Sequence, residues 1–572
     1  MVKRFLAVVG LMVAVGFGNV NATAQDAGTD TSAGQEQQEQ RQEHQNQDQG
    51  TPPAGEDTTT EGEKPLIEVK TGPEDGAQGF SAMVNEQIAP VTDFISAIVF
   101  FEIPLNWLVE DAPGMPVIVI WLIGFATYFT FYMGFPQLRG IKQSWHIVRG
   151  KYDDPDDPGE VTHFQALTAA LSGTVGLGNI AGVALAISIG GPGATFWMIL
   201  SGLFGMASKF TECTLGLHYR HIDADGVVSG GPMHYLKDGL AKLGHHTLGK
   251  VLAVTFAAMA MGGAIGAGNM FQVNQASSIF TGAAVRLTGG ESSIFFGNEW
   301  IFGLIFAFFV GLVIIGGIRK ITHVTEFLVP IMAIIYVSSA LFILISLAGE
   351  IPNAIALILE GAFTGEGIQG GIVGVLIMGL RRAAFSNEAG LGSAAIAHAA
   401  AKTREPIAEG LVALLEPFVD TVLVCTMTAL VIIVTGFHVQ TGTTDGIVLT
   451  TSAFDHVIDG FSYVLTIAAV LFAFSTCITW FYYGQRAFLF LVGNKPRVEL
   501  GFKVFFLALL PIGATMNLTS VMDFADAMIL GMGFPNLVGV FLLRKEVKTM
   551  LKSYLARVKS GEISHYIKKR AH

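Results

Sequence analysis

The amino-acid sequence predicts an all-α membrane protein with about eleven transmembrane helices. Three observations predict this class. Apolar residues make up 51% of the chain, charged residues only 14%, and the mean hydropathy is +0.53. A soluble chain of 572 residues needs more charge than this to cover its surface. From about residue 115 onward, long apolar runs alternate with short polar loops, as membrane-spanning helices require.

The N-terminal part of the chain divides into three segments before the first predicted span. A basic start, a short apolar run and an Ala-Thr-Ala site predict a signal peptide over residues 1–24, with an uncleaved anchor as the alternative. Residues 25–79 are rich in Gln, Glu and Thr, which predicts a disordered tail outside the cell. Residues 80–114 are apolar but contain Pro90 and Pro104, which favours an interfacial segment over a span.

A transmembrane domain is predicted over residues 115–543, followed by a basic cytoplasmic tail over residues 544–572. A spanning helix needs about 20 mainly apolar residues, and eleven runs are candidates. They lie near residues 115–137, 165–189, 192–217, 251–281, 299–318, 324–348, 370–398, 408–436, 463–491, 500–516 and 521–543.

Basic residues predict the orientation of these spans. With the N-terminus outside, the predicted cytoplasmic segments together hold 25 Lys and Arg residues, whereas the external loops after residue 115 hold only Arg286. Such an asymmetry follows the positive-inside rule and predicts an external N-terminus and a cytoplasmic C-terminus. The protein is therefore expected in a bacterial inner membrane.

Two of the predicted spans contain residues that interrupt a helix. The second contains Ser172 to Gly182, in which three glycines fall within six residues, and glycine weakens a helix by about 1 kcal/mol relative to alanine. The seventh contains Phe385 to Ser393, with a carboxylate, an amide and two hydroxyls at mid-span. Polar groups at that depth are costly and usually line a functional cavity. Close helix packing is the alternative for Gly178 and Gly182.

The two interruptions lie five spans apart, which predicts two inverted repeats of five helices after one extra N-terminal helix. Transporters of that design bind their substrate at the membrane midplane, between two discontinuous helices. A channel filter, a zinc-protease motif and a Walker sequence are all absent from the sequence, which disfavours a channel or an enzyme.

An ordered set of motifs over about residues 115–550 resembles the alanine or glycine:cation symporter family, whose members have a LeuT-like fold. The motifs are Phe135 to Leu138, GLGNIAG at Gly176 to Gly182, Gly190 to Ala194, Phe196 to Met198, Gly230 to Met233, Gly268 to Met270, FSNEAGLGS at Phe385 to Ser393, Glu416 to Asp420, and Tyr482 to Gly484. The chain departs from the usual family pattern at Ile199, His234, Ala395 and Gln485.

The resemblance implies sodium-coupled uptake of alanine or glycine by alternating access. It implies no cofactor and no nucleic-acid partner, and it is silent on oligomeric state. The substrate site it implies draws on the second, fourth, seventh and ninth spans. Its residues would be Thr174, Gly176, Gly178, Asn179, Gln272, Asn274, Ser386, Asn387, Glu388 and Trp480, and the sodium ligands would be Ser172, Val175, Ser475 and Thr476.

Several of these assignments have a structural alternative. Asn179 can serve as an interhelical hydrogen-bonding residue, and Trp480 as an ordinary buried aromatic. Glu388 can form an ion pair with Arg381 or Arg382 instead of binding a ligand. A proton-coupled permease of the same fold is the rival function, and it predicts an essential titrating group such as Glu388 or Asp420.

Overall fold

The computed structural model describes residues 89–90, 92–104, 114–288, 293–364, 371–439 and 446–563. The predicted signal peptide and the external tail lie outside these residues. The described chain is helical apart from two small antiparallel sheets. These pair β1 (Glu102–Ile103) with β2 (Met115–Pro116), and β3 (His221–Ile222) with β4 (Val228–Ser229).

Each of the eleven predicted spans falls on a helix or on a helix that is broken in the middle. In chain order these are α3 (Val117–Met133), α5 (His163–Thr174) with η1 (Leu177–Asn179) and α6 (Ala181–Gly190), α7 (Ala194–His218), α10 (His246–Ile265) with η3 (Gly266–Met270) and α11 (Phe271–Thr288), α12 (Glu299–Ile314), α13 (Gly317–Ser346), α15 (Gly371–Asn387) with α16 (Ala394–His398), α17 (Pro406–Ala413) with α18 (Leu415–Pro417), η5 (Phe418–Cys425) and α19 (Thr426–Val434), α21 (Phe461–Val492), α22 (Pro496–Gly513), and α23 (Leu518–Gly531) with α24 (Gly533–Ser560).

By length and hydropathy alone, fewer helices qualify as spans. Among the described residues five helices pass, or seven if each of two bent pairs is one span. The four other predicted spans are helical too, but each is short, interrupted or charged. Helix α12 has 16 residues, α15 ends at the second break, and α7 and α22 carry charged side chains. The all-helical membrane class is confirmed.

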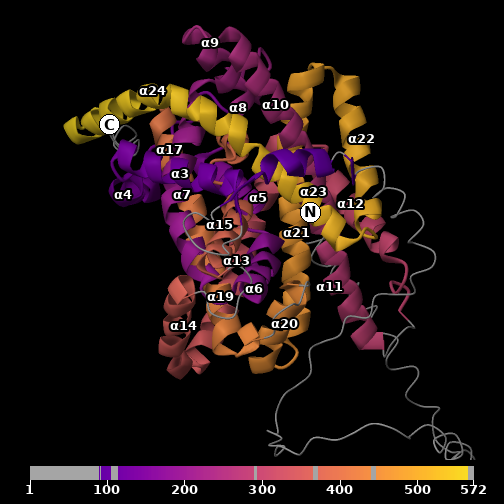
Figure 1. Cartoon of the computed structure of the whole chain (residues 1–572). Coiled ribbons are helices and arrows are strands. Elements are labelled where there is room, and N and C mark those ends of the chain that lie inside the picture. The colour runs from indigo at the N-terminus through magenta and orange to yellow at the C-terminus, as the bar shows by residue number, and fades with distance from the viewer. Residues whose placement is uncertain are drawn as a thin grey trace, which may run out of the picture.

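Helices that the sequence did not predict lie at the two ends of the molecule. They are α4 (Pro136–Val148), α8 (Pro232–His234) with η2 (Tyr235–Gly239) and α9 (Leu240–Lys242), η4 (Ala348–Glu350) with α14 (Ile351–Thr364), η6 (Phe437–Val439), and α20 (Gly446–Val457). Figure 1 shows α4, α9 and α24 at one end and α14 and α20 at the opposite end. The predicted cytoplasmic and external segments thus separate in space.

The first break follows from the backbone of Val175 and Gly176. Helix α5 begins with a capping box between Thr162 and Gln165 and ends at Thr174, and the chain then resumes as η1 and α6 at an angle of 56°. A side chain at Gly176 would place its Cβ 2.6 Å from the Thr476 hydroxyl oxygen. Glycine is therefore required there, because α21 passes directly against the break.

The second break is enforced by left-handed backbone conformations. Glu388, Gly390 and Gly392 have φ values of 55°, 86° and 85°. Such angles are rare for residues other than glycine, so Glu388 marks a strained position of the kind found at functional sites. Both interruptions on which the repeat prediction rests are therefore present. Helix α16 packs against α5, and α15 packs against α6.

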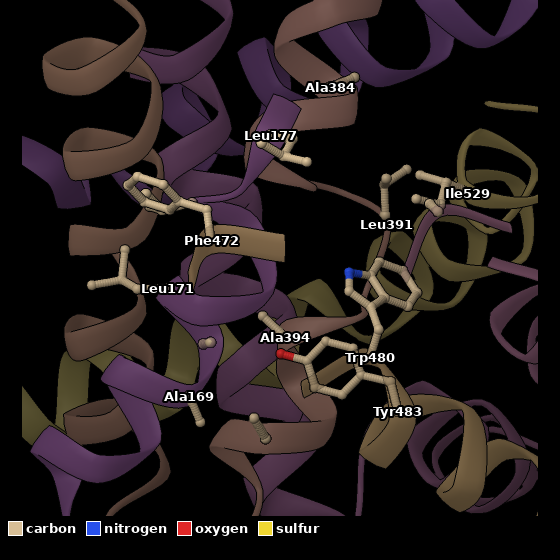
Figure 2. Close-up of a cluster of buried hydrophobic side chains, with 14 of the residues drawn as sticks. Ala169, Leu171, Leu177, Ala384, Leu391, Ala394, Phe472, Trp480, Tyr483 and Ile529 are labelled. Carbon is tan, nitrogen blue, oxygen red and sulfur yellow. The ribbon is translucent and has the colours of Figure 1, made fainter. Parts of the chain in front are cut away.

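Helix α21 fills the space between the two broken helices. Trp480 and Tyr483 stack edge to face with ring centroids 5.4 Å apart. Figure 2 shows both rings beside Ala394 and Leu391, which follow the second break.

At the end of the chain, α24 is fixed at both ends. The Asn536 amide donates to Glu212 (3.0 Å), and the Arg557 guanidinium donates to both carboxylate oxygens of Glu405 (2.7 and 2.6 Å).

Candidate substrate and cation site

Asn179 connects the first break to two other elements. Its side-chain oxygen accepts the Gly176 N–H (2.9 Å), and its NH2 group donates to the Asp420 carboxylate (2.6 Å) and the Ser386 hydroxyl (3.1 Å). The Asn179 side chain is buried. The structure therefore places it in the interhelical role, where it fixes the shape of the break rather than leaving its amide free.

Residues of the second break are paired mostly with the π-helical segment η5. Ser386 donates to the Asp420 carboxylate (2.8 Å), and the Asn387 amide donates to the Thr421 hydroxyl (2.9 Å). Because a π-helical turn widens the helix, it often occurs at functional sites. Asp420 thus gathers Asn179 and Ser386 from the two breaks onto one carboxylate.

Glu388 is held by Trp480 and Ser393. The Trp480 indole N–H donates to the Glu388 carboxylate (3.1 Å) and to the Gly173 carbonyl (3.3 Å), and the Ser393 hydroxyl donates to the other Glu388 oxygen. Trp480, only 1% exposed, therefore bridges the two breaks. These two hydrogen bonds are more than the alternative of an ordinary buried aromatic residue requires.

The alternative in which Glu388 forms an ion pair with Arg381 or Arg382 is not what the structure shows. Both guanidinium groups donate instead to the same oxygen of Asp526 on α23, at 2.7 and 2.8 Å. The reason is geometric, because the chain turns into a left-handed conformation at Glu388 and directs it towards α21. Asp526 lies more than a hundred residues further along the chain.

Gln272 and Asn274 have different surroundings. The Gln272 amide N–H donates to the Ala267 carbonyl (3.0 Å), while its side-chain oxygen is buried and has no hydrogen-bond partner among the described residues. That oxygen lies 3.6 Å from where a Cβ on Gly176 would be. Asn274 donates to the Gly513 and Met516 carbonyls at the end of α22, so the structure does not bring its amide to the breaks.

The predicted sodium ligands come from α5 and α21, and the structure brings Ser172 and Thr476 together. The Thr476 hydroxyl donates to the Ser172 carbonyl (2.9 Å), and the Ser172 hydroxyl donates to the Ser475 carbonyl (2.7 Å). The Ser475 hydroxyl instead donates to Phe472 in its own helix. Val175 directly follows the last residue of α5. The Thr174 hydroxyl, like that of Ser475, donates to a carbonyl of its own helix. Oxygen atoms, the ligands that hard cations prefer, therefore gather at this crossing.

A cavity of about 540 Å³ lies between the segment at residues 89–100 and the start of α23. It reaches Met270 and Arg381, which lie close in sequence to Gly268 and Phe385. Phe385 packs edge to face on Phe271 and also flanks Gly178 of the first break.

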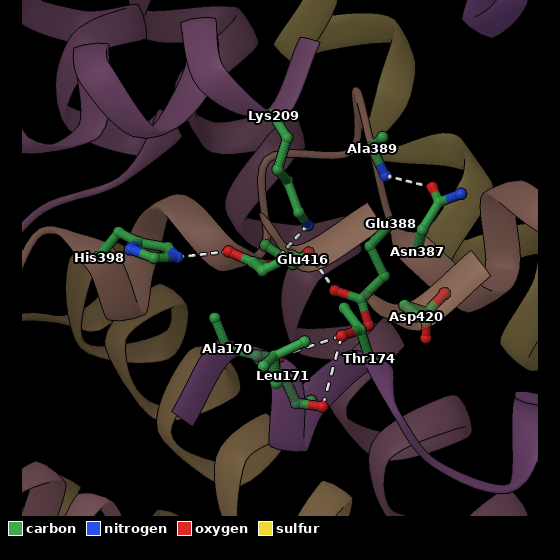
Figure 3. A network of polar contacts seen from close by, with 12 residues as sticks. Ala170, Leu171, Thr174, Lys209, Asn387, Glu388, Ala389, His398, Glu416 and Asp420 are labelled. Carbon is green, nitrogen blue, oxygen red and sulfur yellow. Dashed lines mark hydrogen bonds and ion pairs between the residues drawn. The ribbon is translucent and has the colours of Figure 1, made fainter. Parts of the chain in front are cut away.

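Sequence reasoning missed a chain of buried charges next to this site. Lys209 on α7 contacts Glu416, which in turn contacts His398 (Figure 3). From the sequence alone, Glu416 can serve a second cation or a proton or lock helices together, whereas Lys209 and His398 were not predicted as site residues. The signal was available, because ionisable residues inside apolar spans are rare and usually functional.

Comparisons with known proteins place this architecture in a family. A family profile described as the sodium:alanine symporter family matches residues 104–568. The chain is 39% identical to the sodium/alanine symporter AgcS of Methanococcus maripaludis, over 77% of this chain and 94% of AgcS. It is 34% identical to the probable sodium/glutamine symporter GlnT of Bacillus subtilis, over 80% and 91% of the respective chains.

One further relative and one solved structure are also similar to this chain. The putative sodium/proton-dependent alanine carrier protein YrbD of Bacillus subtilis is 34% identical, over 78% of this chain and 91% of YrbD. The crystal structure of MhsT in complex with L-phenylalanine matches with a TM-score of 0.47 and 13% identity, over 67% of this chain and 98% of MhsT. The protein is a multi-pass membrane transporter rather than an enzyme, and it belongs to the sodium:alanine symporter family.

Proposed function

We propose that the protein carries alanine or glycine into the cell together with sodium, through a site between its two broken helices. The observation that carries this proposal is the meeting of both breaks at Trp480, in a buried region that includes the unpaired side-chain oxygen of Gln272. Discontinuous helices that meet at the midplane are how several transporter folds bind zwitterions and cations.

The amino-acid substrate would be held by its two charged groups. The second half of the first broken helix begins at Leu177 and Gly178, and the first N–H groups of a helix have no partner within it. They would donate hydrogen bonds to the substrate carboxylate, as helix N-termini do for anions. The unpaired oxygen of Gln272 would accept a hydrogen bond from the ammonium group. Trp480 packs closely against Gly268. It would therefore limit the substrate to a small side chain.

Sodium would bind at the crossing of α5 and α21. The proposed ligands are the carbonyls of Ser172 and Val175 and the hydroxyls of Ser475 and Thr476. Ion binding would replace the hydrogen bond that the Thr476 hydroxyl donates to Ser172. Because Ser172 and Val175 lie at the end of the first half-helix, a bound ion would order the break that receives the carboxylate. Each ligand would then favour binding of the other.

The transport cycle would be alternating access in a bacterial inner membrane, with the N-terminus outside and the C-terminus in the cytoplasm. The cavity lined by Arg381 and Asp523 would be the external approach to the site. Inward release would follow movement of the half-helices α5 and α16. A proton-driven cycle is the rival, since Glu388 and Asp420 are both buried near the site.

The deciding experiment is uptake of labelled alanine into proteoliposomes, with an inward sodium gradient compared with an inward potassium gradient at equal pH. Accumulation with sodium alone supports the proposal, and competition by unlabelled glycine or glutamine then defines specificity. Accumulation with a proton gradient but without sodium would support the rival. Movement of glutamine but not alanine would keep the mechanism and overturn the substrate assignment.

A further inference from the structure

Five buried side chains form a continuous line of contacts outside the proposed substrate site. His163 contacts Glu409, Glu409 contacts His398, His398 contacts Glu416, and Glu416 contacts Lys209 at 3.3 Å. We call these five residues the buried charge chain. Four of its side chains are fully buried and His163 is 2% exposed. Figure 3 shows its inner end, where Lys209 and His398 approach Glu416 from opposite sides.

The two contacts of His398 require an extra proton. Its Nδ1 faces a Glu409 oxygen and its Nε2 faces a Glu416 oxygen. Each contact needs one hydrogen between the two atoms, but a neutral imidazole carries only one N–H. The second hydrogen is either on the ring, which makes it an imidazolium, or on one of the carboxylates. In both cases the group of His398, Glu409 and Glu416 holds one proton more than its neutral-histidine form.

Charge balance also favours that proton. With it, an imidazolium and the Lys209 ammonium offset the two carboxylates of Glu409 and Glu416. Without it, a net negative charge remains among fully buried side chains, and an unpaired buried charge costs several kcal/mol. Other titratable or charged groups face this group from the surrounding elements. They are Asp153 before α5, His163 on α5, Glu212, Cys213 and Arg220 on or after α7, Glu388 after α15, Asp420 on η5 and Tyr483 on α21.

The buried charge chain leads to the end of the molecule that carries α4. His163 is the first residue of α5, and the half-buried Asp153 lies close enough for the two charges to interact. Burial raises the pKa of the Asp153 carboxyl above its ordinary value. A group that gains protons readily therefore lies between the solvent and His163. In the orientation proposed above, that solvent is the cytoplasm.

The residues of the buried charge chain also connect the moving parts of the proposed cycle. His163 lies on α5 and His398 on α16, the half-helices on the α4 side of the two breaks, while Glu409 lies on α17. Hydrogen bonds through Glu409 join both half-helices to one carboxylate. Without the proton, His398 has a hydrogen for only one of its two contacts, the one to Glu409 or the one to Glu416, so the attachment of α16 to these two carboxylates is weakened.

We propose that His398, Glu409 and Glu416 form a proton-binding site open to the cytoplasm through His163, and that the bound proton holds the inward gate closed. Transport is then faster when the cytoplasmic side is alkaline. This inference rests on the proposed function for its direction, but the site itself does not depend on the substrate. It is distinct from Glu388 and Asp420, the groups on which a proton-driven cycle would depend.

The test uses right-side-out membrane vesicles that contain the full chain, loaded with buffers from about pH 6 to about pH 8 while the outside pH stays constant. For the unmodified protein, sodium-driven alanine uptake rises severalfold with internal pH. In Glu409→Gln the amide N–H donates to His398 and the amide oxygen accepts from His163, so both contacts form without an extra proton. This variant stays at the slow rate and loses the dependence on internal pH.

A second variant and two controls keep the result interpretable. His398→Gln cannot take up a proton, so it also loses the pH dependence. The exposed residues His245 and Glu360 supply matched controls, and His245→Gln and Glu360→Gln keep the profile of the unmodified protein. If Glu409→Gln responds to internal pH as the unmodified protein does, the proposal is overturned. No alanine uptake by any form would refute the proposed function alone.

A measurement without substrate tests the site in that case. The infrared difference spectrum of the purified protein between the two pH values contains bands of a buried carboxyl or imidazole. These bands disappear in Glu409→Gln and in His398→Gln and remain in His245→Gln. Identical spectra for all forms would show that this group does not bind a proton.

Discussion

Among the hydroxyls proposed as sodium ligands, that of Thr476 reaches across to the opposite helix, whereas that of Ser475 bonds within its own helix. Thr466 lies on the same helix, is equally buried, and donates its hydroxyl to Ser462 in its own helix (2.7 Å). The two residues therefore share size and burial but differ in where the oxygen points. They form a natural pair for asking whether the oxygen at Thr476 binds an ion.

Thr476→Val keeps the shape of the side chain and removes the oxygen. We expect the sodium concentration for half-maximal uptake to rise roughly tenfold, as for the loss of one ligand worth about 1.4 kcal/mol. Thr466→Val should leave sodium activation unchanged. Initial alanine uptake measured against sodium concentration checks both. Equal sodium activation in Thr476→Val and the unmodified protein would remove Thr476 from the cation site.

Gln272→Leu removes the unpaired oxygen that is proposed to accept the substrate ammonium. A hydrogen bond to a charged group is worth about 1.5–3 kcal/mol, so the KM for alanine should rise by at least about tenfold. The control is Gln143→Leu on α4, whose amide donates to Tyr554 (3.4 Å) far along the chain. Uptake kinetics at saturating sodium measure the effect. An unchanged KM would place the ammonium elsewhere.

At the scale of helices, η3 and α21 pack closely beside the proposed site, at Gly268 and Trp480. A Cβ on Gly268 would lie 2.1 Å from the Cβ of Trp480, whereas a Cβ on Gly182 in α6 would meet nothing within 4 Å. Both are buried glycines of a helical segment. Close packing against the backbone end of Trp480 leaves no flexible atom that can move aside.

Gly268→Ala should therefore destabilise the protein by about 1–3 kcal/mol, the usual cost of overpacking, and reduce uptake because Trp480 is displaced from Glu388. Gly182→Ala should be neutral or slightly stabilising, since alanine favours a helix by about 1 kcal/mol over glycine. Thermal unfolding in detergent measures the first effect, and sodium-driven uptake the second. Equal unfolding temperatures for the two variants would contradict the packing argument.

Asp526 joins α15 to α23, because one of its carboxylate oxygens accepts hydrogen bonds from two guanidinium groups. Asp526→Asn would leave the buried Arg382 without its carboxylate, and breaking a buried ion pair from one side costs about 3–5 kcal/mol. The exposed Asp523, one turn earlier, supplies the control Asp523→Asn, which should change stability little. Denaturation midpoints check the prediction. A midpoint for Asp526→Asn equal to that of the control would show that the pair adds no stability.

At the scale of the whole molecule, apolar length and glycine content predicted where the chain crosses and breaks. Each predicted span is helical, and both interruptions are present, because these features depend on local sequence. The partners of the polar residues were not predictable in the same way. The nearby Glu388 was one possible partner of Arg381, yet Arg381 bonds to Asp526 on another helix. Asn274 was grouped with Gln272 in the substrate site that the family resemblance implies, yet their amides point to different elements.

The site was predictable in its location more than in its connections. Glycines and mid-span polar residues identified the breaks, but not the π-helical segment η5 that supplies Asp420 to both. A π-helical turn has no distinct sequence pattern. Whether one carboxylate binds side chains from two helices depends on how those helices pack. For the same reason, Lys209, His398 and Glu409 were visible as charges but not as neighbours.

Helix α24 has a consequence for imaging the protein. Its 28 residues span about 42 Å, more than the roughly 30 Å of the bilayer core, and the Arg557–Glu405 pair holds its far turn. A small transporter inside a detergent belt offers few landmarks for aligning particles. A compact reporter domain fused through a continuous helix after Ser560 would project at a fixed angle. It could serve as a fiducial for cryo-electron microscopy.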